Sequence, residues 1–186
     1  MVDIGCALFN GATLFPWQTK QEGMADLPGW LIQEGITIFS WSPTPFRHLV
    51  ETFNGTEIFP DLRVITLGGE PVSKREFELY KVYFSNNCIF VNRMGTTETN
   101  NFRLYFLDKE SYVDGNILPV GYAVPDKQVL LINESGEVAD VNSVGEIAVK
   151  SPYLALGYWR RPELTEKSFR TDPAGGNERI YLTGDL

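Results

Sequence analysis

The stretch Ile89-Phe-Val-Asn-Arg-Met-Gly-Thr-Thr-Glu-Thr99 sets the expectation for the whole chain, because an apolar segment there gives way to a small polar one. Residues Cys88 to Val91 are rich in β-branched and aromatic side chains, which predicts a buried strand. Gly95 is expected to let the backbone turn and come close to a ligand. The hydroxyls that follow can donate to phosphate or carboxylate oxygens, and Glu98 is a hard oxygen ligand suited to Mg²⁺. An ordinary solvated turn at a strand end is the alternative interpretation.

Two other stretches have a related pattern. The segment Val64-Ile-Thr-Leu-Gly-Gly-Glu-Pro-Val72 predicts a strand that ends in two glycines before a helix starting near Ser73. The segment Tyr181-Leu-Thr-Gly-Asp-Leu186 combines a small turn with an acidic residue. Ligands of parallel sheets bind beyond the carboxyl ends of the strands. The two glycine-bearing strand ends are therefore expected to face one crevice.

Strands and helices alternate in the first part of the chain. Strands are predicted over 13–17, 36–41, 64–67 and 88–91, and helices over 2–10, 24–35, 43–53 and 73–84. Such alternation with short connections predicts an α/β fold, with a mostly parallel sheet and flanking helices.

After Phe102 the pattern changes to short strands and turns. Strands are predicted over 103–107, 127–133, 146–150 and 180–182, and one helix over 162–169. This predicts a small β-rich subdomain, partly barrel-like, packed on the α/β part. We therefore expect two domains, 1–102 and 103–186, the second ending at the Thr-Gly-Asp motif.

The composition excludes several classes of partner. The net charge is −8, so the chain lacks the basic face that nucleic acid or an anionic membrane would require. No apolar run approaches the roughly 20 residues of a membrane span, and no signal-like segment opens the chain. We expect a cytoplasmic protein without nucleic-acid or membrane partners. Cys6 and Cys88 lie far apart in apolar surroundings, which predicts reduced core thiols.

Four groups of short motifs follow one another along the chain. They are Leu67-Gly-Gly-Glu-Pro71, Asn92-Arg-Met-Gly-Thr-Thr-Glu98, Gly145-Glu-Ile147 with Leu156-Gly-Tyr158, and Tyr181-Leu-Thr-Gly-Asp185. In content and order they resemble the core motifs of the adenylate-forming superfamily, most closely the adenylation domains of nonribosomal peptide synthetases. The resemblance implies that the domain in its complete form uses ATP and Mg²⁺. It would convert a carboxylic acid, expected to be an amino acid, and ATP into acyl-AMP and pyrophosphate. It also implies a carrier protein as the partner that receives the product.

The resemblance assigns a nucleotide site to Gly68, Gly69, Glu70, Met94, Gly95, Thr97, Glu98 and Asp185. In this assignment the two glycines lie along the adenine edge, and Met94 occupies a position where the family usually stacks an aromatic ring on the base. Thr97 and Glu98 are the implied catalytic residues, with Thr97 contacting the α-phosphate or the reacting carboxylate and Glu98 binding Mg²⁺. Asp185 is implied to accept hydrogen bonds from both ribose hydroxyls.

The same resemblance assigns the pocket for the acid to Val2, Ser40, Leu67, Arg93, Asn101 and Phe102. Arg93 is unexpected in such a place, because a buried guanidinium needs a partner. It is interpreted either as a partner for an acidic group of the substrate or as half of a salt bridge within the protein.

The resemblance further implies that the chain covers only part of the family's domain. The family's phosphate loop and substrate-binding aspartate would precede Met1, and its mobile C-terminal domain would follow Leu186. We therefore expect the chain alone to be inactive. The alternative function is a catalytically incompetent module that binds a nucleotide or another protein. Sheet edges exposed by truncation are expected to favour self-association.

Overall fold

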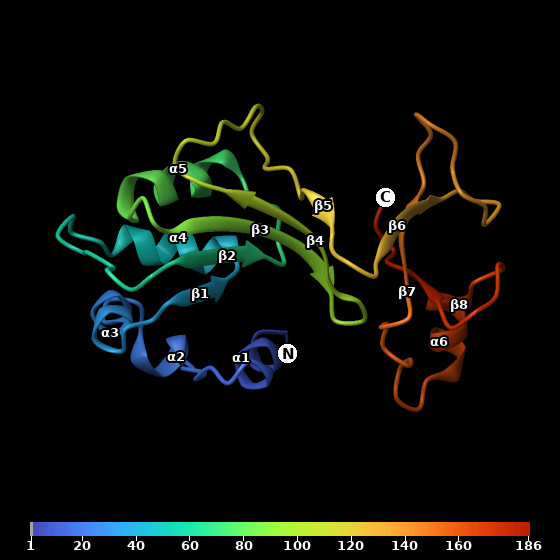
Figure 1. Ribbon diagram of the computed structural model, residues 1–186, viewed down its shortest axis with the longest axis horizontal. Coiled ribbons are helices and arrows are strands. Elements are labelled where there is room, and N and C mark those ends of the chain that lie inside the picture. Colours follow the sequence, from blue (N-terminus) through green and yellow to red (C-terminus); the bar gives the residue numbers. More distant parts are fainter. Residues whose placement is uncertain (1) are drawn as a thin grey trace. The chain divides into compact units, whose positions relative to one another are not determined.

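The computed structural model describes residues 2–186, with side chains described from Ile4 onward. Figure 1 shows the chain coloured along its length. It forms two compact units, one made of the described residues up to Met94 together with Leu104–Gly121, the other of Gly95–Arg103 and Tyr122–Leu186. Because compactness alone does not define a domain, the predicted boundary after Phe102 stays a prediction.

The first unit contains a parallel α/β arrangement. Its elements are α1 (Val2–Phe9), α2 (Thr19–Glu22), α3 (Leu27–Gln33), β1 (Ile38–Trp41), α4 (Pro43–Glu51), β2 (Val64–Gly68), α5 (Lys74–Tyr83) and the start of β3 (Ile89–Thr96). Strand β2 lies between β1 and β3 and runs parallel to both, so that Val64 pairs with Ile38 on one side and Ile89 on the other. The sheet continues with β4 (Asn100–Leu107) and β5 (Tyr122–Ala123). The predicted α/β class is confirmed.

The predicted strand over 13–17 is wrong, because these residues have no regular secondary structure. The aromatic rings of Phe15 and Trp17 pack against Trp30 instead. The indole of Trp17 lies 4.9 Å from that of Trp30, centroid to centroid, and its N–H donates to the carbonyl of Gly23 at 3.0 Å. Pro28 lies in the first turn of α3, where a missing N–H costs nothing.

The core of the first unit lies between the sheet and the helices that connect its strands. Phe46 of α4 and Phe77 of α5 are almost completely buried, as are Ile65 and Phe90 on the neighbouring strands. Tyr80 of α5 stacks on Phe77 with ring centroids 5.7 Å apart. These contacts explain the helical spacing of apolar residues in both helices.

Cys88 lies in this core and is only 1% exposed. The hydroxyl of Tyr80 donates to the backbone carbonyl of Cys88. Burial raises the pKa of the Cys88 thiol to about 11. Cys6 is exposed on α1, and both thiols are free. The prediction of core thiols is therefore right for Cys88 and wrong for Cys6.

Strand β3 is longer than predicted, because the polar residues 92–96 continue it as far as Thr96. Three turn residues then lead into β4, and so short a connection joins antiparallel neighbours. A Cβ on Gly95 would lie 2.4 Å from the carbonyl oxygen of Asn100 and 2.7 Å from the Cα of Asn101. Gly95 therefore permits close approach of two strands, and the prediction that it makes the turn is wrong.

The second unit is built on an antiparallel sheet. Its strands occur in the order β6 (Gln128–Ile132), β7 (Glu146–Ser151), β9 (Arg179–Leu182) and β8 (Phe169–Thr171), with α6 (Pro162–Ser168) preceding β8. All three pairings are antiparallel. Ala148, Ile180 and Leu182 form its apolar centre. The predicted β-rich part is confirmed, and β5 and β8 are additional to the predicted strands.

Candidate functional site

Glu98 is the centre of a hydrogen-bonded cluster in the second unit. The hydroxyl of Tyr158 donates to Oε1 of Glu98 at 2.8 Å and lies 3.5 Å from the hydroxyl of Tyr181. The backbone carbonyl of Glu98 accepts from the N–H of Ala155 at 2.8 Å. Three segments distant in sequence thus meet at one carboxylate, and each belongs to a motif group singled out in the sequence or lies next to one.

The cluster keeps Glu98 ionised. Partial burial alone would raise the pKa of this carboxyl, but hydrogen bonds, with that from Tyr158 foremost, outweigh burial and hold the pKa below its usual value. Burial and the contact with Tyr158 raise the pKa of the Tyr181 hydroxyl. The cluster therefore consists of a carboxylate that accepts from the Tyr158 hydroxyl, with the Tyr181 hydroxyl close to that donor.

The turn that carries Glu98 is fixed from within. Thr99 is fully buried, and its hydroxyl accepts from the N–H of Thr96 at 3.2 Å and donates to the carbonyl of Asn100 at 2.8 Å. The N–H of Thr99 in turn donates to the hydroxyl of Thr96 at 3.2 Å. Thr97 lies in the same turn and is exposed. A rigid turn therefore presents the Thr97 side chain to solvent.

Lys127 supports the same turn and was not found from the sequence. Its amino group donates to the carbonyls of Thr99 and Asn101, the latter at 2.7 Å. Burial lowers the pKa of this amino group. A lysine that binds main-chain carbonyls leaves no motif, because its partners are defined by backbone geometry and not by residue type.

The Thr183-Gly-Asp185 turn is bound to β7. The N–H of Ile147 donates to the carbonyl of Asp185 at 2.8 Å, and the N–H of Thr183 donates to the carbonyl of Ile147 at 3.0 Å. Oε1 of Glu146 accepts from the N–H of Gly184 at 2.7 Å. Two of the motifs, Gly145-Glu-Ile147 and Thr183-Gly-Asp185, are thus in direct contact. Asp185 itself is exposed at the end of this braced turn.

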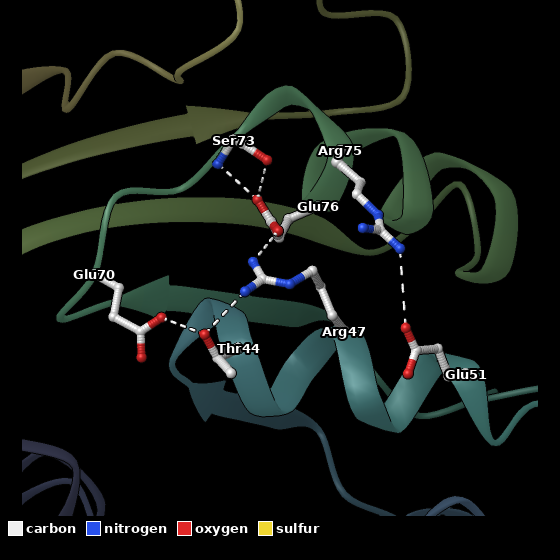
Figure 2. Close-up of polar contacts among 7 residues, drawn as sticks. All are labelled: Thr44, Arg47, Glu51, Glu70, Ser73, Arg75 and Glu76. Atoms are coloured by element: carbon white, nitrogen blue, oxygen red, sulfur yellow. Dashed lines mark hydrogen bonds and ion pairs between the residues drawn. The ribbon is translucent and has the colours of Figure 1, made fainter.

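In the first unit, β2 ends in two glycines with different roles. A Cβ on Gly68 would lie 2.4 Å from Cγ and 2.5 Å from the carbonyl oxygen of Arg93, so Gly68 is required for packing against β3. Gly69 has φ +84° and nothing within 4 Å of where a Cβ would be. Its backbone is accessible to a ligand. The Glu70 side chain that follows points toward α4, where the Thr44 hydroxyl donates to its Oε2 at 2.6 Å (Figure 2).

The predicted pocket residues are spread over four strands. Ser40, Leu67 and Arg93 lie on the adjacent strands β1, β2 and β3 of the first unit. Asn101 and Phe102 lie on β4 within the second unit. Leu67 and Phe102 are buried, and Ser40 and Arg93 both interact with other groups of the protein. The side chain of Val2 lies outside the described part of the structure.

The predicted nucleotide-site residues are divided between the two units. Gly68, Gly69, Glu70 and Met94 belong to the first unit, and Gly95, Thr97, Glu98 and Asp185 belong to the second. The convergence of both sets on one ligand stays a prediction.

Glu98 can serve as one ligand of a metal ion whose other ligands are phosphate and water oxygens. Among the described residues, no group of three or more His, Cys, Asp or Glu side chains could hold a metal ion by itself. Glu98 offers one ionised carboxylate on a fixed turn. Mg²⁺ is commonly bound by one or two carboxylates and completed by phosphate and water oxygens. The donor set therefore suits Mg²⁺ that arrives with a phosphate ligand.

Comparison with known proteins identifies the family. The profile described as AMP-binding enzyme matches residues 1–159. The chain belongs to the AMP-binding enzyme family. Gramicidin S synthase 2 of Brevibacillus brevis is 32% identical over 185 residues, which are 97% of this chain and 4% of that protein. Surfactin synthase subunit 2 of Bacillus subtilis (strain 168) is 33% identical over 184 residues, which are 97% of this chain and 5% of that protein. The predicted resemblance to nonribosomal peptide synthetases is confirmed.

Solved structures share the fold of this family member. The crystal structure of CmiS6 matches with a TM-score of 0.83 at 24% identity, over 98% of this chain and 45% of that one. The Klebsiella oxytoca NpsA N-terminal subdomain, solved in complex with 3-hydroxybenzoyl-AMSN, matches with a TM-score of 0.68 at 23% identity, over 94% of this chain and 41% of that one. The chain thus spans less than half of these structures. Each of its described helices is too short or too polar to cross a bilayer.

Proposed function

We propose that this chain is the central portion of an adenylation domain that in complete form activates a carboxylic acid with Mg-ATP. The reaction joins a carboxylate oxygen to the α-phosphorus and breaks the bond to pyrophosphate, leaving acyl-AMP. The observation that carries the proposal is the ionised Glu98, held by Tyr158 in a chain of the AMP-binding enzyme family. An amino acid is the proposed substrate, because several relatives are peptide synthetases.

On the nucleotide side, the protein's task is to position groups and balance charge. The accessible backbone at Gly69, with Met94, is proposed to lie along the base, and Asp185 to accept from the ribose hydroxyls. Thr97 is proposed to donate to the α-phosphate or the reacting carboxylate. Glu98 would hold Mg²⁺, which when bound would offset phosphate charge beside a protein of net charge −8.

On the acid side, Ser40, Leu67, Arg93, Asn101 and Phe102 are proposed to line the pocket, with Val2 as a sixth member. Arg93 is proposed to pair with an acidic group of the substrate, and its alternative partner is a carboxylate of the protein. Replacing Arg93 by Ala in an active form should shift preference away from acidic substrates. An unchanged preference would contradict this role.

The proposal is tested by calorimetry and by pyrophosphate exchange. We expect this chain to bind Mg-ATP weakly and to catalyse no exchange with any amino acid. Glu98→Gln should weaken binding of Mg-ATP while leaving binding of Mg²⁺-free AMP unchanged, and Glu134→Gln, at an exposed site between β6 and β7, is the matched control. Equal loss for both nucleotides would contradict a metal role for Glu98.

A second candidate function is a catalytically incompetent module that binds a nucleotide or another protein. The chain spans under half of the two solved structures above. Nucleotide binding without exchange, by the chain in its longest natural form, would support it. Exchange by that form would support the first proposal, and absence of any nucleotide binding would contradict both nucleotide functions.

Self-association is proposed through an edge of the larger sheet. Strand β1 forms one edge of the five-stranded sheet, and its Ile38 is 56% exposed. Unpaired edges offer backbone groups to a second chain. Ile38→Lys should abolish any dimer seen by sedimentation, and a concentration-independent monomer before the change would contradict the proposal.

A further inference from the structure

A continuous chain of hydrogen bonds in the first unit runs from a buried acid to the loop after β2 (Figure 2). Nη1 of Arg47 lies 2.5 Å from Oε1 of Glu76, and Nη2 of Arg47 donates to Oγ1 of Thr44 at 2.9 Å. The Thr44 hydroxyl then donates to Oε2 of Glu70 at 2.6 Å. Four side chains from α4, α5 and the β2–α5 loop are thereby connected.

The inner end of this chain is firmly fixed. Glu76 is 0% exposed, and its Oε2 accepts from both the N–H and the hydroxyl of Ser73, each at 2.6 Å. This is the capping box at the start of α5. Arg47 supplies the positive charge that a buried carboxylate needs. The acid and its partners therefore form a rigid base.

The direction of the hydrogen bonds is also fixed. A guanidinium has only donors, so the Thr44 oxygen must accept from Arg47. Thr44 has one proton left, and it donates this proton to Oε2 of Glu70. Glu70 is therefore the acceptor at the outer end of the chain.

The loop between Gly69 and Ser73 is consequently held at both ends. The carbonyl of Val72 accepts from the N–H of Leu118 at 2.8 Å, and the N–H of Lys74 donates to the carbonyl of Asn116 at 2.8 Å. Glu70 provides the attachment at the other end of the loop, next to Gly69 with its positive φ of +84°. Without the hydrogen bond from Thr44 to Glu70, Gly69 and Glu70 would be held only through their connection to β2 and to the far end of the loop.

We propose that Thr44 and Arg47 are positioning residues that fix the Gly68–Glu70 segment through Glu70, and that Glu70 acts by this attachment and not by contact with the nucleotide. The proposal rests on the proposed function, in which the backbone of this segment lies along the base. It assigns a role to two residues of α4 that belong to none of the motifs. It also explains why an acidic side chain beside a proposed site for an anion is directed toward the Thr44 hydroxyl, which itself accepts from Arg47.

Hydrogen exchange on this chain without ligand tests the attachment. Thr44→Val keeps the side-chain shape and removes both hydrogen bonds. We expect the amide of Leu118, which donates to the carbonyl of Val72 in this loop, to exchange about tenfold faster. Thr44→Ser keeps the hydroxyl and should restore the exchange rate of the unchanged chain. Thr52→Val is the matched control, because the hydroxyl of Thr52, the residue that caps the end of α4, donates to the carbonyl of Leu49 at 2.7 Å and not to the loop after β2.

Glu70→Ala breaks the same chain at its exposed end and should produce the same local effect, which keeps the test valid if Thr44→Val fails to fold. Unchanged loop exchange in both variants would overturn the proposal, as would faster exchange spread evenly over the first unit. Binding of AMP, measured separately by calorimetry, should weaken about fivefold in Thr44→Val. Loop loosening without any AMP binding by the parent chain would uphold the attachment and count against the proposed nucleotide function.

Discussion

The hydroxyl of Tyr158 donates to Oε1 of Glu98 at 2.8 Å across a separation of 60 residues. It connects the turn between β3 and β4 to the segment that precedes α6 within one compact unit. The carboxylate proposed to bind Mg²⁺ is therefore held by a partner that sequence motifs alone did not assign. This relationship makes Tyr158 the first residue to change.

Tyr158→Phe should raise the pKa of Glu98, because the carboxylate loses its foremost hydrogen-bond donor. The Phe ring can keep the edge contact with Phe169, whose centroid lies 5.7 Å away. The free energy of unfolding should fall by about 1 kcal/mol. Carbon-detected NMR titration of Glu98 measures the pKa, with the exposed Tyr153→Phe as control. An unchanged titration would show that Tyr158 does not act on Glu98.

Arg47→Met should be strongly destabilising, by about 3 kcal/mol, because it leaves Glu76 as an uncompensated buried charge. Urea denaturation followed by circular dichroism measures the loss. Arg75→Met is the matched control: Arg75 and Glu51 are 3.9 Å apart and well exposed, and such a pair contributes about 0.5 kcal/mol at most. Equal losses in the two variants would contradict the importance of burial.

Acid should weaken the first unit through Glu76. Burial alone would raise the pKa of this carboxyl, but hydrogen bonds from Ser73 and Arg47 hold it below the ordinary 4.5. Because the folded pKa is the lower one, the contribution to stability is present above pH 4.5 and is lost as the pH falls through the folded pKa. Urea denaturation across this range should give a flatter pH dependence for Glu76→Gln. Glu78→Gln, at an exposed position of α5, should keep the original slope.

Gly68→Ala should destabilise the first unit by about 2 kcal/mol, since its Cβ would collide with Arg93 and overpacking has costs of this size. Gly69→Ala should cost about 1 kcal/mol, because only its positive φ is unfavourable there. Gly29→Ala, within α3 and in open space, should be neutral or slightly stabilising. Thermal and urea denaturation give this order, and a different order would contradict the packing account of Gly68.

Much of the fold was predictable because its elements carry local signals. The apolar spacing of α4 and the capping sequence of α5 mark both helices, and the apolar runs of β2 and β6 mark strands. The end of β3 was not predictable in this way. Its polar residues pair with β4, and this pairing depends on the folded hairpin and not on the local sequence. A glycine such as Gly95 is found both in turns and where two strands approach closely, so the residue type alone does not distinguish them.

The candidate site shows the same division. Motif order was sufficient to name Glu98 and Asp185, since residue type and spacing define them. The partners that hold these residues depend on tertiary contacts: Tyr158 comes from 60 positions away, and Lys127 binds carbonyl groups that every residue possesses. The chain of hydrogen bonds through Thr44 was not predictable either, because the residue type of a threonine in a helix does not indicate which side chains its hydroxyl contacts.

The chain has one buried thiol, Cys88, and one exposed thiol, Cys6, and their difference in accessibility can be used to measure how often the core opens. A thiol-modifying reagent should label Cys6 at once, whereas Cys88, with a pKa of about 11, should be labelled only when the core opens. The interval between the two mass increments then reports how often the first unit exposes its interior, without any introduced probe.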